Sequence, residues 1–180
     1  MRRLVVLAVV SLSLAAAQET RREITSTPAP AEDARPNSAQ VPDVYAIGSQ
    51  FQRVLIFRFK YQADLLAGLE QMVKENKIRN AVILAGAGSV RNYQVHQVSN
   101  RTFPSKNMYV KDPTAPADII SMNGYIMNGR IHAHMTMANA DKAFGGHLEP
   151  GTNVFTFAIV TVGVLPDSLD LSKLDDKSYR

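Results

Sequence analysis

The chain has 180 residues, a net charge of +4, 46% hydrophobic residues and no cysteine. The lack of cysteine excludes disulfides and thiolate metal ligands. The basic residues are scattered along the sequence without a polybasic run, so the charge does not indicate a nucleic-acid-binding stripe.

The first residues have the order of a secretory signal peptide. Arg2 and Arg3 precede an apolar run from Leu4 to Leu14, and three alanines ending at Ala17 supply a small-residue cleavage site. The apolar run is shorter than the ~20 residues that cross a bilayer, which favours cleavage over an uncleaved anchor. We therefore expect residues 1–17 to be removed and the mature chain to be secreted or periplasmic.

The rest of the chain divides by composition into three parts. Residues 18–43 contain four prolines among small and charged residues, which predicts a flexible spacer. Residues 44–166 are long enough for one domain with a single core. We expect residues 167–180 to form a short polar tail that is partly loose.

The first half of this domain predicts two strands around a helix. Residues 52–60 are densely apolar and indicate a central strand. Asp64 can cap a helix over residues 65–75, whose apolar residues fall at helical spacing. Residues 81–85 then indicate a buried strand.

A tight turn at residues 86–88 is predicted to lead into another strand over residues 89–98. This strand carries His96. We interpret His96 as a sheet-surface histidine without a ligand role.

The second half of the domain predicts a hairpin and a closing strand. A short strand near residues 107–110 precedes a strand over residues 119–126. Asn128-Gly129 then favours a type I′ turn, which fixes the register of the following strand from Arg130. Residues 154–165 predict the last strand of the sheet.

Three histidines in this half suggest a metal site. His132 and His134 alternate with apolar residues, so a strand presents both imidazoles on one face and Met135 and Met137 on the other. His147 follows Gly145-Gly146 in what we interpret as a loop that folds back. Three neutral imidazoles with a fourth position open are typical of catalytic zinc. Ordinary strand and loop histidines have the same spacing, so spacing alone leaves both interpretations open.

These residues also carry a resemblance. The His132-Ala133-His134 run followed by Gly145-Gly146-His147-Leu148, with the helix near residues 65–75 and the turn from Ala85 to Ser89, resembles the PPC domain, also called DUF296. The resemblance covers most of residues 50–165. It implies an α/β (α+β) fold in which one or two helices pack on a mostly antiparallel sheet, and assembly as a homotrimer.

The resemblance further implies a divalent metal, which we take to be zinc, on His132, His134 and His147. DNA is a partner that the family suggests, because its plant members are AT-hook nuclear proteins. Here Arg35-Pro36 is at most a fragment of an AT-hook. That departure and the predicted export disfavour DNA as the partner of this chain.

Three functions remain open at this point. The first is a metal-binding PPC-domain protein. The second is a metal-dependent enzyme in which the open position activates water, with Glu149 or Asp141 as the candidate general base. The third is a secreted binding or assembly module whose metal stiffens the segment around His147.

Overall fold

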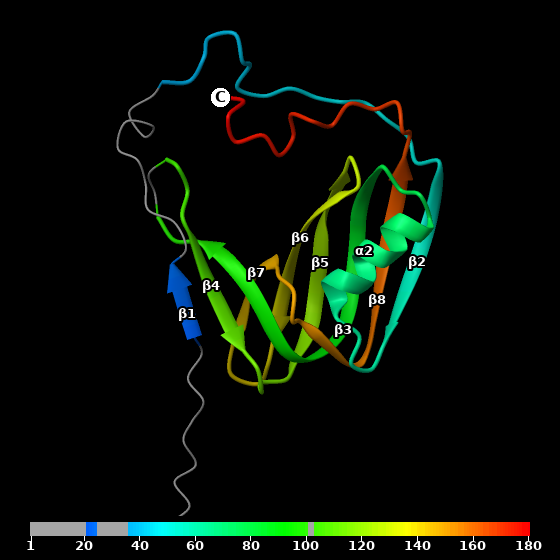
Figure 1. Ribbon diagram of the computed structural model, residues 1–180, viewed down its shortest axis with the longest axis vertical. Helices are drawn as coiled ribbons and strands as arrows, with labels where there is room; N and C mark the ends of the chain where they lie inside the picture. The colour runs from blue at the N-terminus through cyan, green and yellow to red at the C-terminus, as the bar shows by residue number, and fades with distance from the viewer. Residues whose placement is uncertain (1–20, 25–35, 101–102) are drawn as a thin grey trace, which may run out of the picture.

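The structure is a computed structural model that describes residues 21–24, 36–100 and 103–180 (Figure 1). The predicted signal peptide, residues 1–17, lies outside the described residues. The elements in chain order are β1 (Arg21–Ile24), β2 (Arg53–Lys60), α2 (Leu65–Glu75), β3 (Asn80–Val98), β4 (Asn107–Asp112), β5 (Ala117–Met127), β6 (Arg130–Ala138), β7 (Ala143–Leu148) and β8 (Asn153–Leu165). In the described part of the chain, no helix is long and apolar enough to span a membrane.

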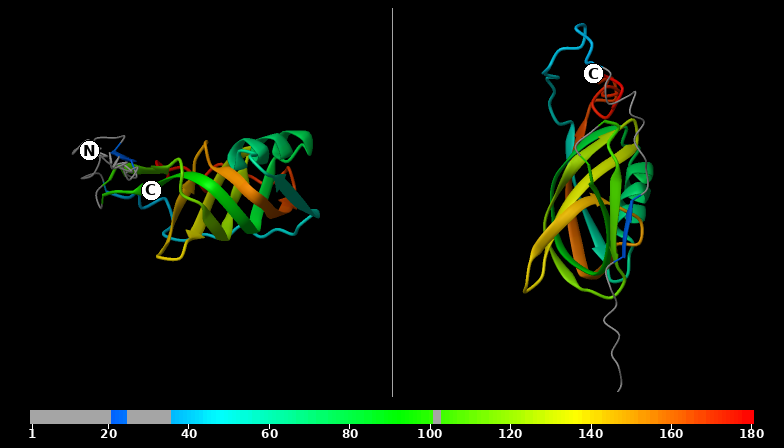
Figure 2. Two further views of the ribbon diagram at one scale, coloured as in Figure 1. Left: turned by 90° about the horizontal axis from the view of Figure 1, so that it is seen from below. Right: turned by 90° about the vertical axis from the view of Figure 1, so that its left-hand side faces the viewer.

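All strand pairs between these elements are antiparallel. The order along the sheet is β1-β4-β3-β5-β6-β7, while β8 pairs with both β3 and β2. Because β7 also pairs back onto β3, the strands β3, β5, β6 and β7 close into a ring. The curvature that this closure imposes is visible in the side view (Figure 2). A mostly antiparallel sheet with a packed helix is confirmed.

Strand β3 corrects the turn that we expected at residues 86–88. It is continuous over 19 residues. Its register against β8 shifts between Ile83 and Ala85 and again after Gly88, which has a φ of +146°. Such irregularities bend and twist a strand without reversing it. The bent strand therefore pairs with β5 and β8 at one end and with β4 and β7 at the other.

Strand β2 is an edge strand, although its apolar density indicated a central one. It pairs with β8. Phe57 and Phe59 point into the core and are 6% and 4% exposed, whereas Val54 and Ile56 on the other face are 54% and 71% exposed. Apolar residues on both faces of a strand usually indicate that both faces are covered. Here the outer face of β2 is apolar but is not covered by the described part of this chain.

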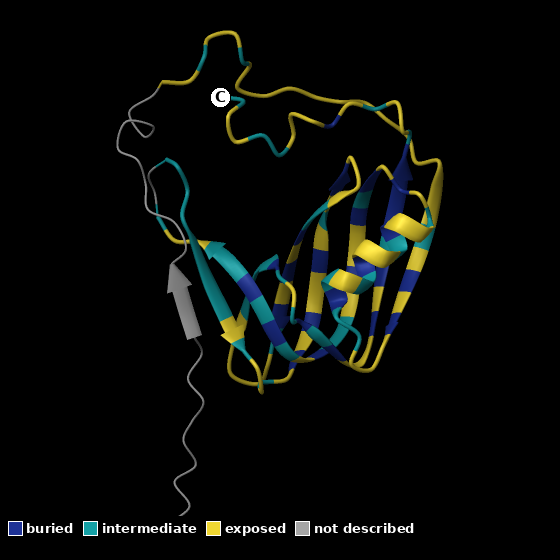
Figure 3. Ribbon diagram, viewed as in Figure 1, coloured by how far each residue is buried: buried dark blue, intermediate teal, exposed yellow. Residues whose placement is uncertain are grey.

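Helix α2 begins and packs as its sequence predicts. The Asp64 carboxylate accepts a hydrogen bond from the Ala67 backbone N–H at 2.9 Å and another from Gly151 at 2.6 Å. The helix thus starts against the β7–β8 turn. Its buried residues Leu65, Leu69 and Val73 alternate with an exposed outer face (Figure 3). A Cβ on Gly68 would meet the Phe59 ring, so the helix lies close to β2.

The C-terminal tail lies over one end of the sheet, where its first residues pack against the domain (Figure 1). Leu171 is 3% exposed and packs with Met127 and Leu165. The fully buried Asn80 side chain donates hydrogen bonds to the carbonyls of Pro166 at 3.3 Å and Leu169 at 2.8 Å. These contacts hold the beginning of the tail beside the β5–β6 turn.

Near the other terminus, β1 pairs with β4 within the segment that composition predicts to be a flexible spacer. Residues 18–20 and 25–35 of the predicted spacer lie outside the described residues, and its flexibility stays a prediction. The backbone groups along the outer side of β4 offer hydrogen-bond partners to any extended segment, whatever its composition.

Candidate metal centre

Three histidines lie side by side on three neighbouring strands. His134 of β6 pairs with His147 of β7, and His147 pairs with His96 of β3. His132 lies two residues before His134 on the same strand. The Asn128-Gly129 turn sets this register, and both of its residues have the positive φ that a type I′ turn requires.

His147 lies in strand β7 and not in a loop, which corrects our interpretation of Gly145 and Gly146. A Cβ on Gly145 would overlap the carbonyl oxygen of Met135, and a Cβ on Gly146 would overlap that of His96. The two glycines therefore let β7 fit between β6 and β3. The sequence pattern that suggested a turn reflects a close approach between strands.

The opposite face of the same strands belongs to the core. Met135 is 3% exposed, Met137 is 0% exposed and Leu148 is 1% exposed. The expected alternation is confirmed, and the methionine thioethers point away from the imidazoles.

His132, His134 and His147 have a geometry that fits a metal ion. Nε2 of His132 and Nε2 of His134 are 3.1 Å apart. The His147 ring centroid is 4.7 Å from that of His132 and 5.2 Å from that of His134. One donor atom from each residue lies within 4.8 Å of the other two. Zinc–nitrogen bonds of 2.0–2.1 Å in a tetrahedron place two donors about 3.3 Å apart, close to the 3.1 Å between the Nε2 atoms of His132 and His134.

The protonation of the cluster also suits a cation. Burial, followed by the charges of the neighbouring histidines, lowers the pKa of His147 to about 4. Burial and the same neighbours lower the pKa of His134 as well. Near neutral pH both imidazoles are therefore uncharged, and the neutral form is the one that coordinates a metal.

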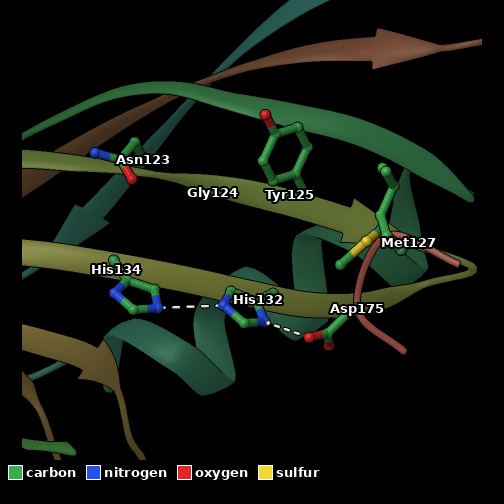
Figure 4. A pocket seen from close by; sticks show the side chains of 8 residues that line it. Asn123, Gly124, Tyr125, Met127, His132, His134 and Asp175 are labelled. Atoms are coloured by element: carbon green, nitrogen blue, oxygen red, sulfur yellow. Dashed lines mark hydrogen bonds and ion pairs between the residues drawn. The ribbon is translucent and has the colours of Figure 1, made fainter. Parts of the chain in front are cut away.

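Two carboxylates contact the histidines of this cluster. Oδ1 of Asp175 lies 3.2 Å from Nδ1 of His132 (Figure 4). Oε1 of Glu149 lies 2.5 Å from Nδ1 of His96. A carboxylate that accepts a hydrogen bond from Nδ1–H fixes the tautomer in which Nε2 keeps its lone pair, and metal-binding histidines are commonly oriented in this way.

His96 belongs to the cluster, so its interpretation as a separate sheet-surface residue is wrong. Its side chain is 19% exposed, and its ring centroid lies 4.5 Å from that of His147. The error arises because the pairing of β3 with β7 joins segments far apart in the sequence. Asp175 was missed for a related reason, since one aspartate among several in a polar tail carries no local signal.

The two candidate general bases are separated by the structure. Glu149 lies in the cluster beside His96. Asp141 lies in the β6–β7 turn, where its backbone N–H donates to the Asn139 side chain at 3.0 Å. Asp141 is in neither of the two groups of potential ligands among the described residues.

A pocket of about 340 Å³ opens beside His132 and His134. The tail supplies one of its walls through Leu174 and Asp175, and strand β5 supplies another. The residues of β5 that line it are Asn123, Gly124, Tyr125 and Met127 (Figure 4).

Comparison with known proteins places most of the chain in one family. The model of the Plants and Prokaryotes Conserved (PCC) domain matches residues 47–166. A curated relative, the bifunctional protein GlmU of Synechococcus sp. (strain JA-3-3Ab), is 26% identical over 137 residues, which are 76% of this chain. The match spans 20% of the length of that relative.

Solved structures resemble the fold. A plant- and prokaryote-conserved (PPC) protein of Pyrococcus horikoshii superposes with a TM-score of 0.58 at 19% identity, over 76% of this chain and 93% of that chain. A hypothetical protein of Salmonella enterica has a TM-score of 0.58 at 23% identity, over 68% and 83%. A metal-containing protein of Archaeoglobus fulgidus has a TM-score of 0.56 at 20% identity, over 68% and 86%.

Proposed function

The chain belongs to the Plants and Prokaryotes Conserved domain family, also called the PPC domain, and we propose that it binds a divalent metal ion, zinc, through His132, His134 and His147. The observation that carries the proposal is the convergence of three imidazoles whose donor atoms lie within 4.8 Å of one another. The similar fold of a metal-containing protein of Archaeoglobus fulgidus supports it. When bound there, the ion supplies a Lewis acid with coordination positions free for a ligand.

Metal analysis of the purified protein tests this proposal. Wild type is expected to hold about one zinc per chain, and His132→Ala is expected to lose most of it because one of three ligands is removed. Tyr125→Phe is the matched control, since Tyr125 pairs with His132 across the hairpin and offers no imidazole. Equal zinc content in wild type and His132→Ala would contradict the proposal.

We expect the protein to be a homotrimer, which rests on the family and on an uncovered apolar surface. The outer faces of β2, β3, β5 and β8 expose large apolar side chains that a second copy could cover. These are Val54, Ile56, Leu84, Ile120, Phe157 and Ile159, which are 39% to 71% exposed.

Light scattering decides this point. The wild-type protein is expected to have three times the monomer mass, and Ile56→Lys/Ile120→Lys is expected to shift it toward the monomer by placing charges in the buried contact. Val44→Lys is the control, because Val44 is 87% exposed and lies in the segment before β2. A monomer mass for the wild type at micromolar concentration would rule out the trimer.

DNA is the partner that we disfavour for this chain. Its net charge of +4 is spread over scattered basic residues, and its N-terminal residues predict export. Any affinity for duplex DNA is expected to be weak at physiological salt. Binding that is tight at low salt and falls steeply with added salt would reverse this conclusion.

A metal-dependent enzyme is the second candidate, and the pocket of about 340 Å³ beside His132 and His134 favours it over a purely structural metal. Glu149 is then the general-base candidate, and it lies beside His96 rather than among the residues that line this pocket. Turnover of simple ester or phosphoester substrates that stops with a chelator and returns with zinc would support it. A metal-loaded protein that turns over none of them fits the binding or assembly module.

A further inference from the structure

His96 and Glu149 lie on the side of His147 that faces away from His132 and His134. His96 stacks on His147 with an angle of 25° between the ring planes. Glu149 follows two residues after His147, and its side chain contacts His96. One donor atom from each of His96, His147 and Glu149 lies within 4.8 Å of the other two.

His96 and Glu149 are both largely shielded from solvent. The side chain of His96 is 19% exposed and that of Glu149 is 18% exposed. The Tyr109 ring of β4 covers His96 with a centroid separation of 5.3 Å. The backbone also fixes the group, since the N–H of Glu149 donates to the carbonyl of Gln94 at 3.1 Å. These side chains are therefore positioned by the sheet, unlike an exposed group of polar residues.

We propose that His96, His147 and Glu149 form a second position for a divalent cation, adjacent to the first and sharing His147 with it. Two imidazoles and one carboxylate are a donor set that zinc and ferrous iron both accept. Nδ1 of His96 and Oε1 of Glu149 are 2.5 Å apart. They need to separate by less than about 1 Å to reach the roughly 3.3 Å between neighbouring donors of one ion. His96 then carries its proton on Nε2.

The shared histidine determines how the two positions are related. A neutral imidazole has one lone pair for a metal, because its other ring nitrogen carries the proton. His147 can therefore serve one ion at a time while it stays neutral. The two positions are alternatives, and a single ion per chain is divided between them. The carboxylate makes the second position better suited to harder ions than the three imidazoles of the first.

The proposal rests on the metal-binding function proposed above and deepens it, so the test uses a chain without two ligands of the first position. The probe is Co²⁺, followed by its visible absorption and by titration calorimetry. His132→Ala/His134→Ala is expected to bind one Co²⁺ per chain at least tenfold more weakly than wild type. Adding Glu149→Gln is expected to weaken binding at least tenfold again, because the charged ligand is lost while the size is kept.

Matched variants separate the possible outcomes. Adding Asp141→Asn to the same double variant removes an acidic group in the β6–β7 turn and is expected to leave Co²⁺ binding unchanged. A double variant that keeps the wild-type circular dichroism and binds no Co²⁺ would overturn the second position. Equal binding with and without Glu149→Gln would overturn it as well. The reciprocal variant, His96→Ala/Glu149→Gln, reports on the first position alone, so a failure of the earlier proposal is recognised separately.

Discussion

Asp175 contacts His132, although it lies beyond residues 47–166, the segment that the family model matches. Its carboxylate accepts from Nδ1 of His132 and also from Arg130 at 2.9 Å. It therefore holds the His132 ring with Nε2 toward His134. In the terms of the proposed metal site, Asp175 is a positioning residue and not a ligand.

Replacing Asp175 with asparagine is expected to weaken zinc binding by roughly 10- to 100-fold, the usual loss when such an orienting carboxylate is removed. Competition with a chromogenic chelator measures the change. Asp176→Asn is the control, because Asp176 is the neighbouring aspartate and its carboxylate accepts hydrogen bonds from Lys173 and Ser178. Identical zinc affinities for wild type and Asp175→Asn would remove Asp175 from the centre.

The pKa of His147 predicts how the metal-free protein responds to acid. Its pKa falls from 6.5 to about 4 on folding, so the unfolded chain takes up the proton first as the pH decreases. Between these values the unfolded state binds more protons, and the free energy of unfolding decreases with falling pH. This contribution to stability is complete above about pH 6.5 and lost near pH 4.

Urea unfolding in the presence of a chelator, across this pH range, tests whether His147 causes this loss of stability. Wild type is expected to lose stability more steeply than His147→Gln, which cannot take up the proton at this position. His134 contributes in the same direction, since its pKa is also lowered. Parallel pH profiles for the two proteins would show that His147 is not the group responsible.

At the scale of elements, the sequence predicts those features of a strand, helix or turn that depend only on residues close together in the chain. Strand alternation, the Asp64 cap and the Asn128-Gly129 turn are all local, and the structure confirms each of them. The edge position of β2 and the pairing of β3 with β7 depend on contacts between distant segments, which a pattern within one segment does not contain. Alternation therefore predicts that His132 and His134 share one face of a strand. No local pattern predicts that His96 lies beside His147.

The fit of β7 between its two neighbours is testable at Gly146. Gly146→Ala is expected to lower the free energy of unfolding by about 1–3 kcal/mol or more, because its Cβ would overlap the His96 carbonyl oxygen in a tightly packed ring of strands. Chemical denaturation measures the loss. Gly48→Ala is the control, since a Cβ at Gly48 would meet nothing within 4 Å. Equal unfolding midpoints would contradict the close approach.

For the whole molecule, the outstanding question is where the mature chain begins. The order of two arginines, an apolar run and three alanines predicts cleavage before Gln18. Intact-mass measurement on protein from its native host is expected to give a chain that starts at or near that residue. Recovery of the soluble protein with Met1 still present would contradict the predicted export.

The position of the tail has a further consequence for the whole molecule. Leu171 anchors the tail beside β5, and Asp175 joins it to His132. An ion bound at His132 and a docked tail therefore stabilise each other, and such coupling is reciprocal. Metal loading is expected to slow digestion of the last residues by a carboxypeptidase, and a chain trimmed past Asp175 is expected to exchange its ion faster. The C-terminus of this protein would then report, through its protease resistance, whether the centre is filled.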